Sequence, residues 1–382
     1  MKRAVQAYRT DQLSVEEGLR FLVLAGAIAC DGWDLPGWSA IAGQHLEFTR
    51  EAGALNALQF GLNSVIYPRL FGGDLGTAGA LLDEAEALAE VAGTTLHPYG
   101  AIGLAAYRGD QQRGGRLIAA ARADALSRGE GLVLALTSWA SAVMCNGNGD
   151  YPSARAHCLD LLRGPPDDDG RPSLLPVGSQ PGGWTLAELV EAATRCDDLA
   201  TATAAAGRLA EVAAAIGTDW ALGVAARSEA LLDDGGPAED LFREAIDRLG
   251  RAGVGVELAR THLLYGEWLR RSGRRADART LLRDAHDALA AMGAEAFAER
   301  ARRELAATGE TVRRRRADTR QELTAQELHI ARLAAEGRTN PEIGAELYLS
   351  RHTVEWHLRK VFAKLDVTSR RQLRTALGRP VA

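Results

Sequence analysis

The feature that most constrains the fold is a short motif that recurs along the first 310 residues. A turn centred on glycine is followed, five residues later, by a small or apolar residue that begins an apolar stripe of helical spacing. Successive copies are 36 to 48 residues apart, an interval typical of helix-pair repeats. The turn and the small or apolar residue of each copy are Gly73 and Ala78, Gly109 and Gly114, Gly149 and Ala154, Asp197 and Ala202, Gly236 and Leu241, and Gly273 and Ala278. A helix pair cannot bury its apolar face alone, so we expect these pairs to stack into an all-α array.

The clearest copy spans residues 258–286 and predicts two antiparallel helices on either side of Gly273. It resembles a tetratricopeptide repeat, because small or bulky apolar residues match that motif at Tyr265, Gly266, Leu269, Gly273, Ala278 and Ala285. The resemblance implies a tetratricopeptide-like superhelix whose concave face could bind a partner. A helical array that only packs, without a binding groove, stays an alternative.

Charge divides the chain into two parts. Residues 311–382 hold 15 basic and 8 acidic residues, a net charge of +7, whereas the preceding 310 residues carry −12. A basic segment on an acidic body suggests a module that binds a polyanion. We expect four segments: a helical-repeat domain over 1–308, a Pro/Gly-rich loop within it at 164–183, a basic linker over 309–320, and a C-terminal domain over 321–382.

No pattern in the sequence indicates an enzyme, a metal site or a cofactor site. The four cysteines have no Cys-x-x-Cys spacing, and the chain has no phosphate loop, nucleophile elbow or zinc-protease motif. The uncharged stretch Gly131–Gly149 contains Thr, Ser and Asn, so we expect a buried helix there and no membrane span. With no signal-peptide pattern at the N-terminus, we expect a cytoplasmic protein without catalytic residues, metal or cofactor.

Residues 323–377 hold the densest set of local signals. Thr324 and Glu327 form a capping box, and Gly337 is a C-terminal cap, so a first helix of about 12 residues is expected. A second, short helix follows at once, with Thr339 or Asn340 as its N-cap. Two short helices joined in this way are typical of a helix-turn-helix.

A third helix is expected over residues 351–365 and a fourth over residues 369–377. Apolar residues of the third helix are spaced 4, 3 and 4 apart, so they line one face toward a core: Val354, Leu358, Val361 and Leu365. The opposite face carries His352, Trp356, Arg359 and Ala363. An exposed Trp beside hydrogen-bond donors, on a helix whose apolar face is already complete, fits a surface that meets a partner.

Together these motifs resemble the DNA-binding domain of the LuxR family. The matching segments are residues 323–324, 337–343, 349–350, 353–358, 364–365 and 369–370. The resemblance implies a four-helix LuxR-type helix-turn-helix domain that binds double-stranded DNA as a homodimer, with the third helix in the major groove. Carried over residue by residue, it implies base readout by Glu355, Trp356 and Arg359, phosphate contacts by Thr353, His357, Lys360 and Arg370, and dimerisation through Leu373 and Leu377. Glu355 stands where many members have Lys, so the resemblance implies a different target sequence from that of Lys-bearing relatives.

The body adds a second resemblance. Residues 255–311 and the stretch 184–195 look like the helical region of the large ATP-binding regulators within the LuxR family. Those regulators carry an N-terminal P-loop ATPase, and this sequence has no such motif. Either the chain is a short form without the nucleotide switch, or Met1 starts inside a longer gene.

The sequence therefore predicts a transcriptional regulator in which a helical-repeat body controls a C-terminal DNA-binding domain. The body would act as a sensor or docking module for a protein or small-molecule effector. The alternative is a helical-repeat adaptor that acts mainly through protein contacts and carries a degenerate DNA-binding module. The third helix separates the two hypotheses, since an adaptor has no reason to keep Arg359, Lys360 and Lys364 beside an intact turn.

Overall fold

The computed structural model describes residues 13–53, 55–94, 98–162, 181–233, 235–310 and 325–347, and six single positions, 354, 358, 361, 362, 367 and 373. All regular structure in this part of the chain is α-helical, as predicted. The chain divides into two compact units, Met1–Thr311 and Val312–Ala382. The linker predicted at 309–320 lies almost entirely outside the described residues, so its bounds stay a prediction.

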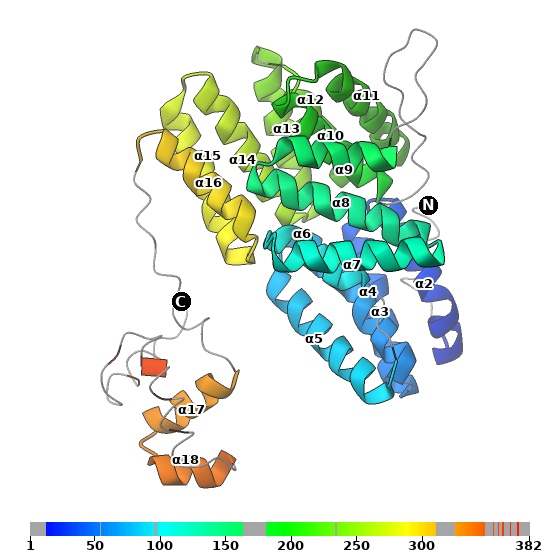
Figure 1. Cartoon of the computed structure of the whole chain (residues 1–382), viewed down its shortest axis with the longest axis vertical. Coiled ribbons are helices and arrows are strands. Elements are labelled where there is room, and N and C mark those ends of the chain that lie inside the picture. The colour runs from blue at the N-terminus through cyan, green and yellow to red at the C-terminus, as the bar shows by residue number, and fades with distance from the viewer. Residues whose placement is uncertain are drawn as a thin grey trace. The chain divides into compact units, whose positions relative to one another are not determined.

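In the first unit the helices follow one another as antiparallel pairs (Figure 1). The helices are α2 (Val15–Asp31), α3 (Leu35–Ala52), α4 (Leu55–Gly72), α5 (Leu75–Ala92), α6 (Tyr99–Arg108), α7 (Arg113–Arg128), α8 (Gly131–Asn148), α9 (Tyr151–Leu162), α10 (Gly182–Arg195), α11 (Leu199–Ile216), α12 (Asp219–Ala230), α13 (Gly236–Ala252), α14 (Gly255–Arg271), α15 (Arg275–Met292) and α16 (Glu295–Ala307). The expected helix over the uncharged stretch is α8, and the best repeat copy is the α14–α15 pair. The loop predicted at 164–183 lies mostly outside the described residues, and α10 already begins at Gly182, because Gly182 and Gly183 pack in the core.

Most pairs are closed by a residue in the left-handed region of backbone space. Between α4 and α5, Gly73 has a φ of 92°, and the Asp74 carboxylate accepts a hydrogen bond from the backbone N–H of Thr77 at 3.0 Å. The predicted turn residues with positive φ are Gly73, Gly109, Gly149, Asp197 and Gly273. These copies of the turn motif are therefore confirmed.

One predicted turn differs from the structure, and one turn lies where none was predicted. Gly236 begins α13 and does not lie in the turn before it. The first pair, α2 and α3, turns at Trp33, which has a φ of 50° without being glycine. Trp33 keeps this conformation because its side chain is only 2% exposed in the core and Asp34 caps α3 through the N–H of Gly37 at 3.0 Å.

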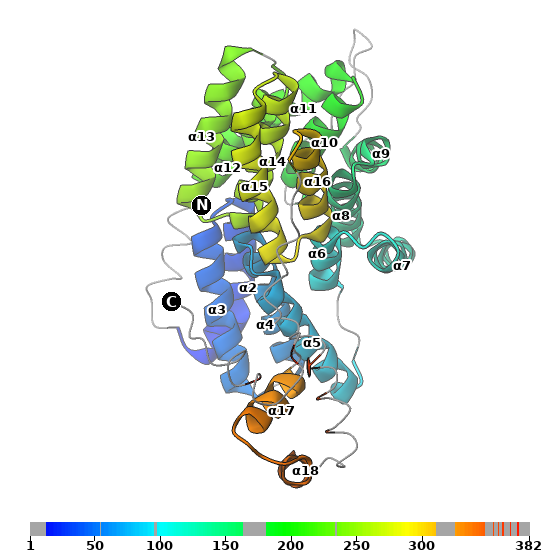
Figure 2. The ribbon, with the colours of Figure 1, turned by 90° about the vertical axis from the view of Figure 1, so that its left-hand side faces the viewer.

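The array curls back on itself, so its inner face is enclosed. Figure 2 shows α14 and α16 beside helices from the first half of the unit, and α14 contacts α4 while α16 contacts both α6 and α8. The inner helix α10 is buried on all sides, whereas the outer helix α15 buries only one stripe. Side chains therefore fill the concave face that the superhelix hypothesis expected to be free.

Aromatic side chains from seven helices and from the α2–α3 turn fill one part of this interior. Phe71 on α4 lies with its ring centroid 4.8 Å from those of both Trp184 and Trp220. The connected, buried members are Trp33, Trp38, Tyr67, Phe71, Tyr107, Trp139, Trp184, Trp220 and Phe297. Aromatic residues are only 5% of the chain, yet nine of them gather in this cluster.

Buried charges fill the neighbouring part of the interior. Four carboxylates meet four guanidinium groups there: Glu188, Glu191, Glu257 and Glu267 with Arg195, Arg227, Arg260 and Arg300. The Arg260 guanidinium binds Glu188 with two parallel hydrogen bonds of 2.6 and 2.8 Å, although both side chains are at most 3% exposed. We call these eight residues the buried ion network. Their formal charges cancel, which limits the cost of removing them from water.

The arginines of the network favour the ionised form of three of its carboxylates, Glu191, Glu257 and Glu267. Burial by itself raises the pKa of Glu191, but the adjacent Arg300 and Arg260 outweigh it and lower the pKa below its ordinary value. The pKa values of Glu257 and Glu267 are also lowered, because their arginine partners outweigh the effect of burial. No sequence pattern predicted this network. Its one local signal is the pair Glu188 and Glu191 on α10, a helix whose other buried residues are apolar except for Thr185.

Among the described helices, α11 has the length and composition that would allow it to cross a membrane, with a mean hydropathy of 1.3 over residues Leu199–Ile216. In this structure α11 packs against α10 and α12. It is an Ala-rich outer helix that buries Ala202, Ala205, Leu209 and Ala213.

Candidate nucleic-acid interface

The first helix of the second unit, α17 (Ala325–Ala335), ends at the predicted glycine cap. Gly337 has a φ of 97° and donates its N–H to the carbonyl of Ala334 at 3.2 Å, while Arg338 donates to Leu333 at 3.1 Å. Only a residue that tolerates a left-handed backbone closes a helix in this way at low cost. The predicted cap at the other end, Thr324, lies outside the described residues.

The second helix, α18 (Asn340–Leu347), begins with a capping box. Of the two N-cap candidates, Thr339 is the cap: its N–H and hydroxyl donate to Oε2 of Glu342 at 2.7 and 2.9 Å, and its hydroxyl accepts from the N–H of Glu342 at 3.5 Å. The backbone N–H of Thr339, followed by its hydroxyl, lowers the pKa of Glu342. Three residues therefore separate the end of α17 from this cap, which fixes a tight turn between the two helices.

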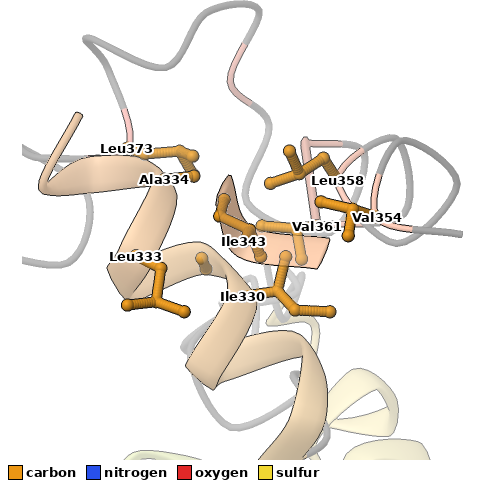
Figure 3. Close-up of a cluster of buried hydrophobic side chains, with 9 residues drawn as sticks. Ile330, Leu333, Ala334, Ile343, Val354, Leu358, Val361 and Leu373 are labelled. Carbon is orange, nitrogen blue, oxygen red and sulfur yellow. The ribbon is translucent and has the colours of Figure 1, made fainter. Parts of the chain in front are cut away.

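A single apolar core joins α17 and α18 to helical positions further along the chain. Its buried members are Ile330, Ala331, Leu333, Ala334, Ile343, Val354, Leu358, Val361 and Leu373. Figure 3 shows Ile330, Ile343 and Val361 pointing toward one another. Val354, Leu358 and Val361 are the predicted inward stripe of the third helix, and their burial confirms that face; the fourth predicted member, Leu365, lies outside the described residues.

Most of the predicted contact residues also lie outside the described residues. They are Glu355, Trp356 and Arg359 for base readout, Thr353, His357, Lys360 and Arg370 for phosphates, and Leu377 for dimerisation. Leu373, the other predicted dimer residue, is described, and its side chain is 0% exposed within the core of its own unit. Its role in dimerisation stays a prediction, and the structure gives it a packing role that the sequence analysis missed.

A short helix, a tight turn, a capped second helix and a buried stripe from a third segment define a helix-turn-helix module. Residues 321–376 match the family described as "Bacterial regulatory proteins, luxR family". The chain thus carries a LuxR-type helix-turn-helix domain at its C-terminus, as the motifs predicted.

Curated relatives resemble the chain over this domain. The transcriptional regulatory protein LiaR of Bacillus subtilis (strain 168) is 50% identical over 50 residues, which are 13% of this chain and 24% of LiaR. The HTH-type transcriptional regulator AlkS of Alcanivorax borkumensis is 36% identical over 53 residues, or 14% of this chain and 6% of that protein. AlkS of Pseudomonas putida is also 36% identical, over 50 residues. The match thus spans a quarter or less of each of these relatives, all of which are named as transcriptional regulators.

Proposed function

We propose that this chain is a sequence-specific DNA-binding transcriptional regulator that acts as a homodimer on double-stranded DNA. The observation that carries the proposal is the buried stripe Val354, Leu358 and Val361 within a LuxR-type domain. At 100° per residue, a helix that buries this stripe turns positions 356 and 359 to the opposite side, where they can enter a major groove. The net charge of +7 over residues 311–382 supports binding to a polyanion.

In this proposal the third helix separates two kinds of contact. Arg359 reads a base edge together with Trp356 and Glu355, since a guanidinium can donate two hydrogen bonds to guanine and a carboxylate can accept from cytosine. Thr353, His357, Lys360 and Arg370 bind phosphates and set the register of the helix on the duplex. Leu377 and the surface around Leu373 hold the dimer together.

The first unit is proposed to be a tetratricopeptide-like sensor or docking body that controls the DNA-binding domain. Its interior is packed, so an effector would bind at its surface or in a cavity and not along an open concave groove. The chain would work in the cytoplasm, without catalysis or a bound cofactor, in keeping with relatives that are named as regulators.

Selection of DNA from a random pool by the full chain at about 0.15 M salt tests the proposal, because nonspecific phosphate binding is weakened at that ionic strength. An enriched inverted repeat is the expected outcome. The control is the first unit alone, residues 1–311, which is acidic and should enrich nothing. A full chain that enriches no motif would favour the adaptor alternative.

A further inference from the structure

The first unit contains a cavity of about 220 Å³, partly open to solvent, that no part of the proposed DNA-binding mechanism uses. Residues of α2, α3, α4, α8 and α10 contribute to its wall. Among the described residues of this wall none is Asp, Glu, Lys or Arg, and most of the surface they present is hydrocarbon. Protein interiors are close-packed, so an apolar hollow of this size is costly unless a ligand fills it.

Polar groups of the wall are paired inside the protein or shielded from the cavity. The Tyr67 hydroxyl donates to a backbone carbonyl of α6 at 3.1 Å, and the Ser64 hydroxyl donates to a carbonyl one turn earlier in α4 at 2.7 Å. Asn63 Oδ1 accepts from a backbone N–H of α6 at 3.1 Å. Nδ1 of His45 and Nε1 of Trp184 are buried away from solvent and do not open into the cavity. A ligand therefore meets hydrocarbon here and finds no hydrogen-bond partner in these five side-chain groups.

The titratable side chains of the wall favour their uncharged forms. Burial lowers the pKa of His45, which favours the neutral imidazole at pH 7. Burial also raises the pKa of the Cys30 thiol and of the Tyr67 hydroxyl well above their ordinary values. A charged ligand would therefore leave water for a site that offers it no counter-ion, which is strongly unfavourable.

Two large apolar side chains of the wall are also exposed to solvent. Phe60 on α4 is 43% exposed and Leu132 on α8 is 51% exposed, although both line the cavity. They give an apolar molecule a surface for first contact at the mouth. An engineered cavity of about 150 Å³ holds benzene, so a cavity of about 220 Å³ has room for roughly eight to ten carbon atoms.

We propose that this cavity binds a small, uncharged, hydrocarbon-like molecule of roughly eight to ten carbon atoms. Such a ligand is held because its own apolar surface and that of the wall are removed from water together, without a hydrogen bond from the protein. Its size follows from the volume of the cavity, and its lack of charge and of polar groups follows from the wall. The inference rests on the sensor role in the proposed function and deepens it by naming the class of effector.

The test titrates the full-length protein with ethylbenzene, benzyl alcohol and benzylammonium at about pH 7.5, without DNA, by calorimetry. The three probes share one skeleton and differ only in a terminal methyl, hydroxyl or ammonium group. We expect saturable binding of ethylbenzene at one site per chain, about tenfold weaker binding of benzyl alcohol, whose hydroxyl loses water without gaining a partner, and no binding of benzylammonium. Absence of saturable ethylbenzene binding, or equally tight binding of either polar probe, would overturn the proposal.

A charge at the mouth locates the site. Leu132→Asp replaces an apolar wall residue by a carboxylate, and because Leu132 is half exposed the fold should tolerate the change. The matched control is Leu126→Asp on α7, since Leu126 is 59% exposed and does not line the cavity. Leu132→Asp should weaken ethylbenzene binding about fivefold or more, through lost apolar contact, and Leu126→Asp should leave it unchanged. Equal effects would remove the site from this cavity.

A variant that fills the cavity gives a second measurement. Gly26 lies in the wall on α2, and a Cβ added there would meet Ile41 and Trp38 only at 3.8 and 4.0 Å, so Gly26→Leu adds volume without a clash at Cβ. The matched control is Gly207→Leu on α11, where a Cβ would meet nothing within 4 Å and which does not line the cavity.

The measurement is the rise in Tm that ethylbenzene causes by binding the folded state. Gly26→Leu should lose most of this rise and Gly207→Leu should keep it, whereas rises of equal size would place the bound ethylbenzene outside the cavity. If Gly26→Leu does not fold, the Leu132→Asp titration still decides the proposal. No DNA is present, so a negative result here leaves the DNA-binding proposal standing, and a failed DNA selection leaves this one standing.

Discussion

Arg300 on α16 donates a hydrogen bond from Nη1 to Oε1 of Glu191 on α10 at 2.5 Å, although 109 residues separate them in the sequence. Their side chains are 4% and 2% exposed. Arg300 also binds Glu267 through Nε and Nη2 at 2.7 and 2.8 Å. The contact exists only when the array has curled far enough to bring its last helix onto its middle, so it reports on closure of the whole first unit.

Replacing Arg300 by Leu should lower the free energy of unfolding of the first unit by about 3–5 kcal/mol, because Glu191 and Glu267 lose a buried partner. Arg302→Leu on the same helix is the control. Arg302 pairs with Glu299 at 2.5 Å, but both side chains are about half exposed, so its loss should cost less than about 1 kcal/mol. Urea unfolding at pH 7 measures both, and equal losses would contradict a structural role for the network.

Acid should destabilise the first unit through the same carboxylates. Burial opposes ionisation of Glu191, but Arg300 and Arg260 prevail and lower its pKa from 4.5 to about 2. A carboxylate whose pKa is lower in the folded than in the unfolded protein stabilises the fold. Its full contribution is present above the unfolded-state pKa and is lost as the pH falls to the folded-state pKa. The loss from Glu191 is on the order of 3 kcal/mol between about pH 5 and pH 2. The urea unfolding midpoint should fall as the pH is lowered from 6 to 3, and it should fall less steeply in the Glu191→Gln variant. A midpoint of the wild-type protein that does not change with pH would show that the network does not stabilise these carboxylates in their ionised form.

The capping box at the start of α18 should have a measurable effect. Thr339→Ala removes the hydroxyl that contacts both the N–H and the carboxylate of Glu342, at a cost of about 1 kcal/mol. Thr339→Ser keeps the hydroxyl and should be close to neutral. Hydrogen exchange of the amides in residues 340–347 measures the difference. A loss of about 1 kcal/mol corresponds to about fivefold lower protection in the Ala variant. Identical exchange in the two variants would mean that the cap contributes nothing.

Arg359→Ala tests base readout. If Arg359 donates to a base edge, its removal should weaken binding at the selected site by about 1–3 kcal/mol and relax preference at one base position. Binding to a panel of single-base variants of the site measures both effects. A variant that keeps full discrimination would remove Arg359 from base recognition.

Lys360→Ala is the counterpart for phosphate contact. Losing one phosphate contact should weaken binding to all sequences alike and flatten the dependence of log K on log salt by about one unit. The measurement is a salt titration of wild type and variant on the same duplex. Equal salt dependences of wild type and variant would show that Lys360 does not contact a DNA phosphate.

Local features of this protein were predictable where neighbouring residues decide them. The turns at Gly73 and Gly273, the cap at Gly337 and the inward stripe from Val354 to Val361 rest on interactions within four or five residues or on helical periodicity. The turn at Trp33 could not be predicted in this way, because Trp33 adopts a positive φ where tertiary packing buries its ring.

The all-α class, most helix pairs and the LuxR-type domain were predictable from the sequence, since periodicity and caps act over short distances. Two features depend on the tertiary fold and were not predictable. The array encloses its inner face, and Glu188, Glu191, Arg260 and Arg300 meet inside it. A charged residue on an isolated helix pair would be read as solvent-facing. Its burial depends on the curvature accumulated over several stacked pairs, and that curvature is set by packing between residues far apart in the chain.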